Sequence, residues 1–403
     1  MKNLTIVIPV FNALSETKRC IHSILNSDAK DASLLLINDG SLSGVQSALL
    51  DEFGSVENIS IFESFRNRGY TASVQFGLEN TNTKYLCILN SDTMVPKVWA
   101  SKLIRHLDDN HFVAGVGPVS NAASYQSVPL VKGDGGFSTN DNLGEDEAGL
   151  ENVNRVLSTF SKNSFVSVPI LNGFCTIFRT RSLLQIGGFD RKSFPVGYGE
   201  ENDVCIRLLG EGFLLGVSID VFVFHEKSKS FGTERKKKLS KEGRATLDVK
   251  FGSNMLSDLS AKLKSCSELD LLRLWLSFVF DLEDVNVLTN SKAKTLKENK
   301  LYTFEGPLQL NISAKGKLLV SQSDSEAFQV SGSTDAIDVV VPKGRTFSIV
   351  SDSPIESALV NLAYESYFEV VSLTDWSGAF NSLEDTNQFK MPFKMLSLNE
   401  VEN

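Results

Sequence analysis

Three carboxylates crowd into four residues near the middle of this chain of 403 residues. Glu200, Glu201 and Asp203 lie between a Gly-rich turn and an apolar segment. Carboxylates this close repel one another, so folding them together raises the pKa of at least one. Such a cluster is typical of a site where a carboxylate takes a proton or faces a hydroxyl-rich ligand. The alternative is that Glu200 and Glu201 occupy the first turn of a helix, where the helix dipole favours acids.

Three other residues could take part in chemistry, and each follows an apolar run that is typical of a buried strand. Asp39 and Asp92 come after two early runs, and His225 follows a later one. A lone carboxylate at a strand end can hold Mg²⁺ or Mn²⁺ when phosphate and water supply the remaining oxygens. Each acid is equally consistent with a turn or a helix cap, and the histidine with a structural hydrogen bond.

The elements that must position these residues alternate along the first half of the chain. Strand-like runs cover 4–11, 34–37, 59–62 and 85–89, and helix-like segments cover 15–27, 43–53 and 70–80. This alternation predicts an α/β fold, with a mostly parallel sheet and helices on both faces. Ligands bind such sheets at the carboxyl ends of the strands, which is where Asp39 and Asp92 lie.

Beyond residue 118 the sequence pattern changes twice. Residues 119–165 are polar and predict a long loop, which in a compact domain is usually functional or mobile. The segments predicted beyond it are a strand within 166–178, a helix through Glu211, a strand over 217–224 and mainly helical structure over 235–300. From 301 on, short alternating runs separated by Gly, Ser, Asp and Pro predict a small all-β domain of sandwich type. The predicted domains are therefore 1–240, a helical linker or extension at 241–300, and a β-sandwich-like accessory domain at 301–403.

Composition narrows the class of protein. A net charge of −9 argues against a general nucleic-acid binder. The basic cluster Arg235–Lys238 stands out, either as a cationic flap over a phosphate or as a solvated helix face. The five cysteines are widely spaced and indicate reduced, buried thiols without zinc spacing. With no signal peptide and no long apolar run, we expect a cytoplasmic protein, and we interpret 271–280 as a buried or interface helix.

Several common enzyme motifs are missing from the sequence. There is no Gly-x-Gly-x-x-Gly after the first strand, no Walker A loop, no Gly-x-Ser-x-Gly and no His-Glu-x-x-His. Dehydrogenase, NTPase, hydrolase and zinc-protease interpretations therefore lack their basic parts.

Seven motifs, taken in order, resemble those of the family 2 glycosyltransferases, which have the GT-A fold. They are Ile8-Pro-Val-Phe-Asn12, Asn38-Asp-Gly-Ser41, Asn67-Arg-Gly-Tyr70, Leu89-Asn-Ser-Asp-Thr93, Gly187-Gly-Phe-Asp190, the segment Gly197–Arg207, and His225. The resemblance covers residues 4–232 and is greatest to the rhamnosyltransferase-like enzymes that build bacterial surface polysaccharides. The family more often has Asp where this chain has Glu201, and often Asn near Val74 and Gln75.

The resemblance implies an inverting, metal-dependent glycosyltransferase. It would move a sugar from a UDP-, dTDP- or GDP-linked donor to a hydroxyl of a glycan or lipid-linked acceptor. Glu201 would be the catalytic base, with Glu200, Asp203 and Gly173 on the acceptor side. The implied donor-binding residues are Pro9, Val10, Asn12, Asp39, Asn67, Gly69, Asn90, Ser91 and Asp92. Asp92 and His225 would hold Mn²⁺ or Mg²⁺.

Two rival hypotheses come from other functional classes. The chain could be a glycan-binding or scaffold protein with a degenerate transferase domain, its β-domain holding a glycan or a partner. A nucleotidyltransferase is a third option, but it would need a Gly-rich phosphate loop after the first strand. We also expect peripheral association with the inner face of the membrane, and a homo-oligomer formed through 260–403.

Overall fold

The computed structural model describes residues 1–129, 131–133, 136–137, 143–160, 165–227 and 233–264, isolated positions between 266 and 276, and strands up to residue 373. The chain divides into two compact units. The first comprises Met1–Asn154 and Phe165–Ser267, and the second comprises Arg155–Ser164 and Glu268–Asn403.

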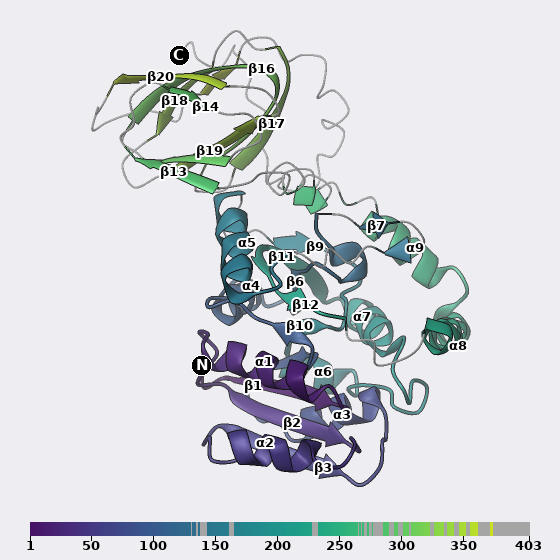
Figure 1. Cartoon of the computed structure of the whole chain (residues 1–403). Coiled ribbons are helices and arrows are strands. Elements are labelled where there is room, and N and C mark those ends of the chain that lie inside the picture. Colours follow the sequence, from purple (N-terminus) through teal and green to yellow (C-terminus); the bar gives the residue numbers. More distant parts are fainter. Residues whose placement is uncertain are drawn as a thin grey trace. The chain divides into compact units, whose positions relative to one another are not determined.

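The first unit is built on an eight-stranded sheet (Figure 1), with the order β3-β2-β1-β4-β10-β6-β11-β9. The strands are β1 (Leu4–Val10), β2 (Ser33–Asp39), β3 (Ile59–Ser64), β4 (Tyr85–Leu89), β6 (Val113–Val119), β9 (Phe165–Ser167), β10 (Cys175–Arg179) and β11 (Leu214–Phe222). Strands β3, β2, β1 and β4 run parallel, as do β6 and β11. Strand β10 is antiparallel to β4 and β6, and β9 to β11. The predicted α/β fold with a mostly parallel sheet is confirmed.

Helices cover both faces of this sheet, which is why its strands are apolar almost throughout. Successive side chains of a strand point to opposite faces. Ile6 and Ile8 pack in one core with α1 (Leu14–Leu25), α2 (Val45–Phe53) and α4 (Ala100–Asp109). Val7 points the other way and contacts Gly77 of α3 (Tyr70–Glu79) so closely that a Cβ there would overlap it.

A two-stranded ladder follows the carboxyl end of β4. Strand β5 (Thr93–Met94) pairs antiparallel with β12 (Phe224–His225), so that Thr93 lies opposite His225. This short pairing joins two segments that are 130 residues apart in the chain, the distance from Met94 to Phe224. It therefore brings the polar residues after β4 next to those after β11.

The acidic segment begins helix α7 (Glu200–Gly210), whose N-cap is Gly199. Helix α6 (Thr180–Gln185) precedes it, and α8 (Thr233–Phe251) and α9 (Met255–Lys264) follow β12. Phe194, Ile206, Leu247 and Leu259 form one buried cluster, which joins α7, α8 and α9. Helix α8 thus packs directly behind the acidic segment.

The prediction of one long loop over 119–165 is wrong. This region contains α5 (Glu147–Phe160), the 3₁₀ turn η1 (Ser124–Gln126) and the short strands β7 (Lys132–Gly133) and β8 (Gly136–Phe137). The helix buries an apolar stripe with helical spacing, made by Leu150, Val153, Val156 and Leu157. Because polar residues separate the apolar ones, the sequence pattern did not indicate this helix. The single strand predicted within 166–178 is two, β9 and β10, joined by a turn.

The expected helical character of 235–300 holds only in part. Helices α8 and α9 reach Lys264, but β13 (Val285–Thr289) and β14 (Lys294–Leu296) are strands. Most of 271–280, predicted as a buried or interface helix, lies outside the described residues.

Every described residue from 285 onward is in a strand, which agrees with the predicted all-β character of this part. The strands are β15 (Leu301–Glu305), β16 (Leu308–Gln322), β17 (Glu326–Ser333), β18 (Ile337–Val341), β19 (Thr346–Ser351), β20 (Ile355–Asn361) and β21 (Val371–Leu373). The long strand β16 pairs with β18 and β20 over its first half and with β17 and β19 over its second. The sandwich form and the domain boundaries remain predictions.

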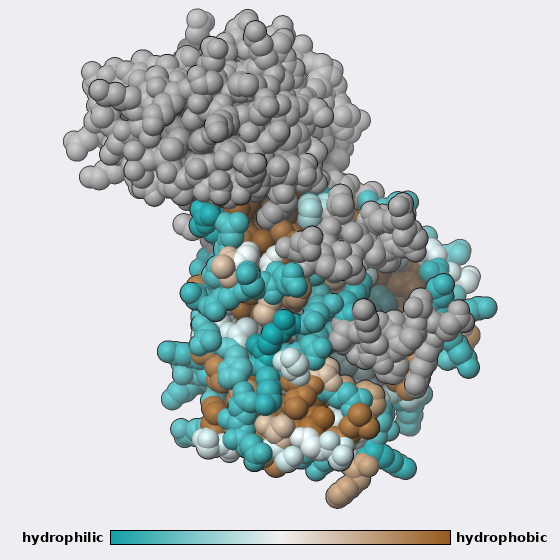
Figure 2. Space-filling view, viewed as in Figure 1, coloured by the Kyte–Doolittle hydropathy of each residue, from teal (hydrophilic) through white to brown (hydrophobic). Residues whose placement is uncertain are grey.

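The surface of the first unit, on the face shown in Figure 2, is largely hydrophilic with scattered apolar side chains. Leu42 and Phe65 are two of the most exposed large hydrophobic residues. None of the helices in the described part of the chain combines the length and apolar character that a membrane span requires.

Candidate active site

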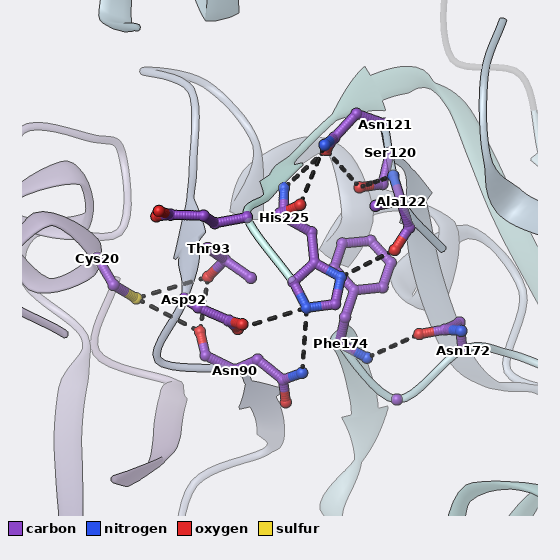
Figure 3. A network of polar contacts seen from close by, with 12 residues as sticks. Cys20, Asn90, Asp92, Thr93, Ser120, Asn121, Ala122, Asn172, Phe174 and His225 are labelled. Atoms are coloured by element: carbon purple, nitrogen blue, oxygen red, sulfur yellow. Dashed lines mark hydrogen bonds and ion pairs between the residues drawn. The ribbon is translucent and has the colours of Figure 1, made fainter. Parts of the chain in front are cut away.

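Asp92 and His225 meet because the β5–β12 ladder holds their segments together (Figure 3). The Oδ1 atom of Asp92 lies 3.3 Å from Nε2 of His225, and the two side chains are 12% and 8% exposed. This pairing brings together two of the residues that the sequence singles out. These two residues are 133 positions apart in the chain, the difference between 225 and 92.

The His225 ring is held in one orientation from three sides. Its Nδ1 lies 2.9 Å from the Ala122 carbonyl oxygen, its main chain exchanges two hydrogen bonds with Asn121, and its ring stacks on Phe174 (Figure 3). A carbonyl oxygen only accepts, so Nδ1 carries the hydrogen and a neutral ring turns the Nε2 lone pair toward Asp92. Histidines that bind metals are commonly fixed in this way through their other nitrogen.

The contact between Asp92 and His225 needs a positive charge. A carboxylate oxygen and an Nε2 lone pair repel each other at this distance unless a proton or a metal ion lies with them. The oxygen and nitrogen donors suit Mn²⁺ and, less closely, Mg²⁺. Among the described residues no group of three or more His, Cys, Asp or Glu side chains could hold a metal. Asp92 and His225 would therefore supply two protein ligands, with a bound ligand and water as the others.

Asp39 binds main chain at the neighbouring strand end. Its side chain is buried and accepts hydrogen bonds from the backbone N–H groups of Arg68 at 2.9 Å and Gly69 at 2.8 Å. In this structure the predicted nucleotide-binding acid therefore holds the loop after β3 in place. Asn67, also predicted to contact the donor, is exposed on this loop.

The loops after β1 and β2 are tied together beside Asp39. The Asn12 N–H donates to the Ser41 hydroxyl at 2.8 Å, and the Asn12 side-chain oxygen accepts from the Leu42 N–H at 2.9 Å. Pro9 and Val10, the other predicted donor contacts on this side, end β1 directly before this junction. These predicted residues therefore share one edge of the sheet.

Gly69 joins the loop after β3 to the acidic segment. Its φ is +92°, and a Cβ there would overlap the carbonyl oxygen of Pro195. Both the backbone conformation and the close approach require glycine. The loop held by Asp39 therefore lies directly against the segment that leads to Glu200.

Glu201 lies on the far side of this junction. One of its carboxylate oxygens accepts from the Gly199 N–H at 3.2 Å, and Gly173 lies against its aliphatic stem. The Tyr70 hydroxyl is 3.2 Å from both the Asn90 side-chain oxygen and the Gly173 carbonyl oxygen. Tyr70 thus bridges the side of the site that carries Asn90 and the side that carries Glu201.

A small enclosed cavity of about 20 Å³ lies between Tyr70, Gly173, Glu200 and Glu201. Glu200 is 5% exposed, and burial, followed by the negative charge of Glu201, raises its pKa well above its usual range. Burial, followed by the neighbouring acids Glu200 and Glu201, likewise raises the pKa of Tyr70. Glu200 is therefore the member of the acidic cluster whose pKa is raised, as the repulsion between carboxylates predicts.

Asp203 has a different environment. Its side chain is fully buried and binds Arg207, whose Nε donates at 2.8 Å, and Lys250, whose Nζ donates at 2.5 Å. Lys250 also binds Asp190 at 2.9 Å, and these hydrogen bonds to Asp203 and Asp190 outweigh burial and raise its pKa. The buried Asp203 therefore links α7 to α8, and its contact with the acceptor stays a prediction.

Three residues that shape this site were not predicted from the sequence. Tyr70 ends the motif Asn67-Arg-Gly-Tyr70, but nothing in the sequence indicates its role. Asn121 lies in the polar region interpreted as a loop, and Lys250 lies far along α8 with no local signal. Of the basic cluster 235–238, Lys237 and Lys238 are exposed at the start of α8, and Lys238 forms an ion pair with Glu242.

Comparisons with known proteins show what this chain is similar to. Residues 5–186 match the model of "Glycosyl transferase family 2". This segment of the chain is therefore similar to the family 2 glycosyltransferases, and it lies within the α/β sheet described above. The loop motifs of the donor side lie inside the matched segment, and the acidic segment and His225 lie beyond it.

Curated relatives are similar over part of their length. An uncharacterized glycosyltransferase of Rickettsia bellii is 24% identical over 219 residues, which are 53% of this chain and 27% of the relative. The glycosyltransferase GlyA of Streptococcus pneumoniae is 23% identical over 28% of this chain and 16% of its own. An uncharacterized glycosyltransferase of Haemophilus influenzae is 27% identical over 28% of this chain and 45% of its own. The chain thus spans less than half the length of these relatives.

Two solved structures were also found. GalNAc-T7 with UDP, GalNAc and Mn²⁺ aligns at 15% identity with a TM-score of 0.46, over 68% of this chain and 54% of its own. The mannosyltransferase PcManGT from Pyrobaculum calidifontis, with GDP-Man and Mn²⁺, aligns at 14% identity with a TM-score of 0.42, over 68% of this chain and 85% of its own. Because both TM-scores fall below 0.5, neither likeness says anything about the ligands of this chain.

Replacing Lys250 by Met should destabilise the first unit, because the buried carboxylate of Asp203 would keep Arg207 as its remaining cation. A hydrogen bond to a charged group contributes about 1.5–3 kcal/mol, so the free energy of unfolding should fall by roughly that amount. Urea unfolding followed by circular dichroism measures it, with Lys241→Met on the exposed side of α8 as the control. Adding Asp203→Asn to Lys250→Met should recover part of the loss. Equal stability of the two lysine variants would contradict the role assigned to Lys250.

Proposed function

We propose that the chain is a metal-dependent inverting glycosyltransferase that uses a nucleotide-sugar donor. The observation that carries this proposal is the contact between Asp92 and His225, whose facing acceptor atoms call for a cation beside the donor-side loops. The family match supports the transfer of a sugar, and this contact supports the metal.

The donor would lie along the edge formed by the loops after β1, β2, β3 and β4. Asp39 fixes the loop that ends in Gly69, and Asn12 fixes the loop after β2. A donor base would lie over Pro9, Val10 and Asn67, and the diphosphate near Asn90 and Ser91. This placement follows the rule that ligands of such sheets bind beyond the carboxyl strand ends.

A divalent cation held by Asp92 and His225, when bound, supplies positive charge beside the diphosphate leaving group. The protein holds His225 for this through Ala122, Asn121 and Phe174. Because the ring is fixed before any ligand binds, little reorganisation is needed at this point of the site.

Glu201 would be the general base. It takes the proton of the acceptor hydroxyl while that oxygen forms a bond to the anomeric carbon, and the bond from this carbon to the diphosphate oxygen breaks. A base of this kind accelerates reactions by about 10²- to 10⁴-fold. Half-buried Glu201 can exchange its proton with solvent, whereas Glu200 is enclosed. Attack opposite the leaving group inverts the anomeric centre.

The acceptor and setting are proposals from the sequence resemblance. They comprise a glycan or lipid-linked acceptor, a role in bacterial surface polysaccharides, a cytoplasmic location with contact to the membrane face, and a homo-oligomer through 260–403. The all-β part would then hold a glycan, a second copy or the rest of the chain. A glycan array probed with the whole protein distinguishes the first of these from the others.

Nucleotides should stabilise the protein only together with metal. We expect one of UDP, dTDP, GDP and CMP, with Mn²⁺, to raise the thermal unfolding temperature, because a ligand at about 100 times its Kd stabilises the native state by about 2.7 kcal/mol. The Asp92→Ala variant should lose the metal-dependent part of the shift. A full shift in Asp92→Ala would refute the metal role, and no shift in the wild type for any nucleotide would favour a glycan-binding or scaffold protein.

Changing Glu201 to Gln should abolish transfer and spare donor binding. The amide cannot take the acceptor proton, so the rate should fall by about 10²- to 10⁴-fold. The same nucleotide and metal should still raise the unfolding temperature, which shows that the site is folded. Release of nucleoside diphosphate from nucleotide sugars, with acceptor present, measures the rate. Near-normal turnover in Glu201→Gln would rule Glu201 out as the base.

A further inference from the structure

Two fully enclosed acids lie three residues apart at the start of α7, and they differ in their partners. Asp203 is held by the two cations Arg207 and Lys250. Among the described residues, no cation binds Glu200, and one of its side-chain oxygens, Oε2, has no hydrogen-bond partner. Burying an unpaired carboxylate is far more costly than burying a neutral carboxylic acid. Asp203 is therefore the charged member of this pair, and Glu200 is the neutral one.

Burial and the neighbouring acid Glu201 favour the neutral form of Glu200, and they outweigh the backbone hydrogen bonds that favour the charged form. Helix α3 contributes the Tyr70 ring, and α7 contributes Glu201 and Cys205, which line the same cavity. The negative charge of Asp92, which lies beyond Asn90, also raises the pKa of Tyr70. The titratable groups around Glu200 are thus acids or neutral groups. None of them, in the part of the chain that the structure describes, offers a positive charge.

A neutral Glu200 has a proton to donate, and Glu201 lies within reach of it. The two side chains line the same cavity, and hydrogen bonding with Glu201 is among the causes that raise the pKa of Glu200. If Glu200 is neutral, its O–H is the donor and the Glu201 carboxylate is the acceptor. This hydrogen bond and the Gly199 N–H at 3.2 Å hold the Glu201 carboxylate from two directions.

We propose that Glu200 is a neutral carboxylic acid that donates a hydrogen bond to Glu201 and so positions the Glu201 carboxylate as the base, an inference that rests on the role proposed for Glu201. Glu200 is then a positioning residue, and no proton passes through it. Its O–H fixes the orientation of the Glu201 carboxylate. The sequence assigned Glu200 to acceptor contact, whereas its burial gives it this internal role.

Infrared spectroscopy tests the protonation directly. At neutral pH the wild type should show the C=O stretching band of a protonated carboxylic acid, and Glu200→Gln should lose that band. Glu201→Gln should keep the band at a shifted frequency, because an amide oxygen is a weaker acceptor than a carboxylate. Absence of the band in the wild type, or its loss in Glu201→Gln alone, would overturn the proposal.

The pH dependence of stability gives a second test that needs no substrate. A folded-state pKa above the ordinary value of 4.5 means that Glu200 stabilises the protein fully below that pH and loses this contribution as pH rises toward the folded value. Glu200→Gln lacks this loss. The stability of Glu200→Gln relative to wild type should therefore increase as pH rises above 4.5. A difference that does not change with pH would contradict a buried neutral acid.

Transfer rates separate positioning from a purely structural role. Glu200→Gln keeps a neutral hydrogen-bond donor, whereas Glu200→Ala removes it, so the rate of Glu200→Ala should be roughly 10- to 100-fold lower than that of Glu200→Gln. Nucleotide-induced stabilisation should be the same in both. Equal rates in these two variants would overturn the positioning role. If no nucleotide binds even the wild type, the transferase proposal fails, while the infrared band still reports on Glu200.

Discussion

The pairing of β5 with β12 is the constraint on which the site depends. Four residues form it, yet it brings the end of β4 to the end of β11. Without this ladder Asp92 and His225 would belong to separate loops of the sheet edge. The ladder has few hydrogen bonds of its own, so it relies on Asn121 and Phe174 to hold His225 and on the buried core beneath it. The contact between Asp92 and His225 is thus positioned by packing outside the pair.

The acidic segment shows how a fold can place acids together and assign them different states. Asp203 receives two cations and ties α7 to α8. Among the residues that the structure describes, no cation binds Glu200, which lines a small cavity with Tyr70, while Glu201 is half-buried. Three acids that look alike in the sequence therefore have three different environments, and our proposals assign the neutral donor to Glu200 and the base to Glu201. Their partners come from helices that lie far apart in the chain.

Local sequence signals predicted strands β1 to β4 and helices α1 to α3 well, because each of these strands contains a short apolar run that ends at polar residues. They failed for α5, whose apolar stripe is scattered among polar residues, and for β13 and β14. In the site, strand-end residues such as Asp92 were predictable from topology alone. The role of Tyr70 and the partner Lys250 were not, because nothing in the local sequence reveals which distant side chain packs against an acid.

Electron paramagnetic resonance of Mn²⁺ tests the central claim most directly, because the signal of the free ion falls when the ion is bound. The account predicts that wild-type protein and a nucleoside diphosphate together lower the free-ion signal further than either does alone. In Asp92→Ala, this additional loss should disappear. An unchanged signal with wild-type protein for UDP, dTDP and GDP, or an equal additional loss in the variant, would contradict a metal site at Asp92 and His225.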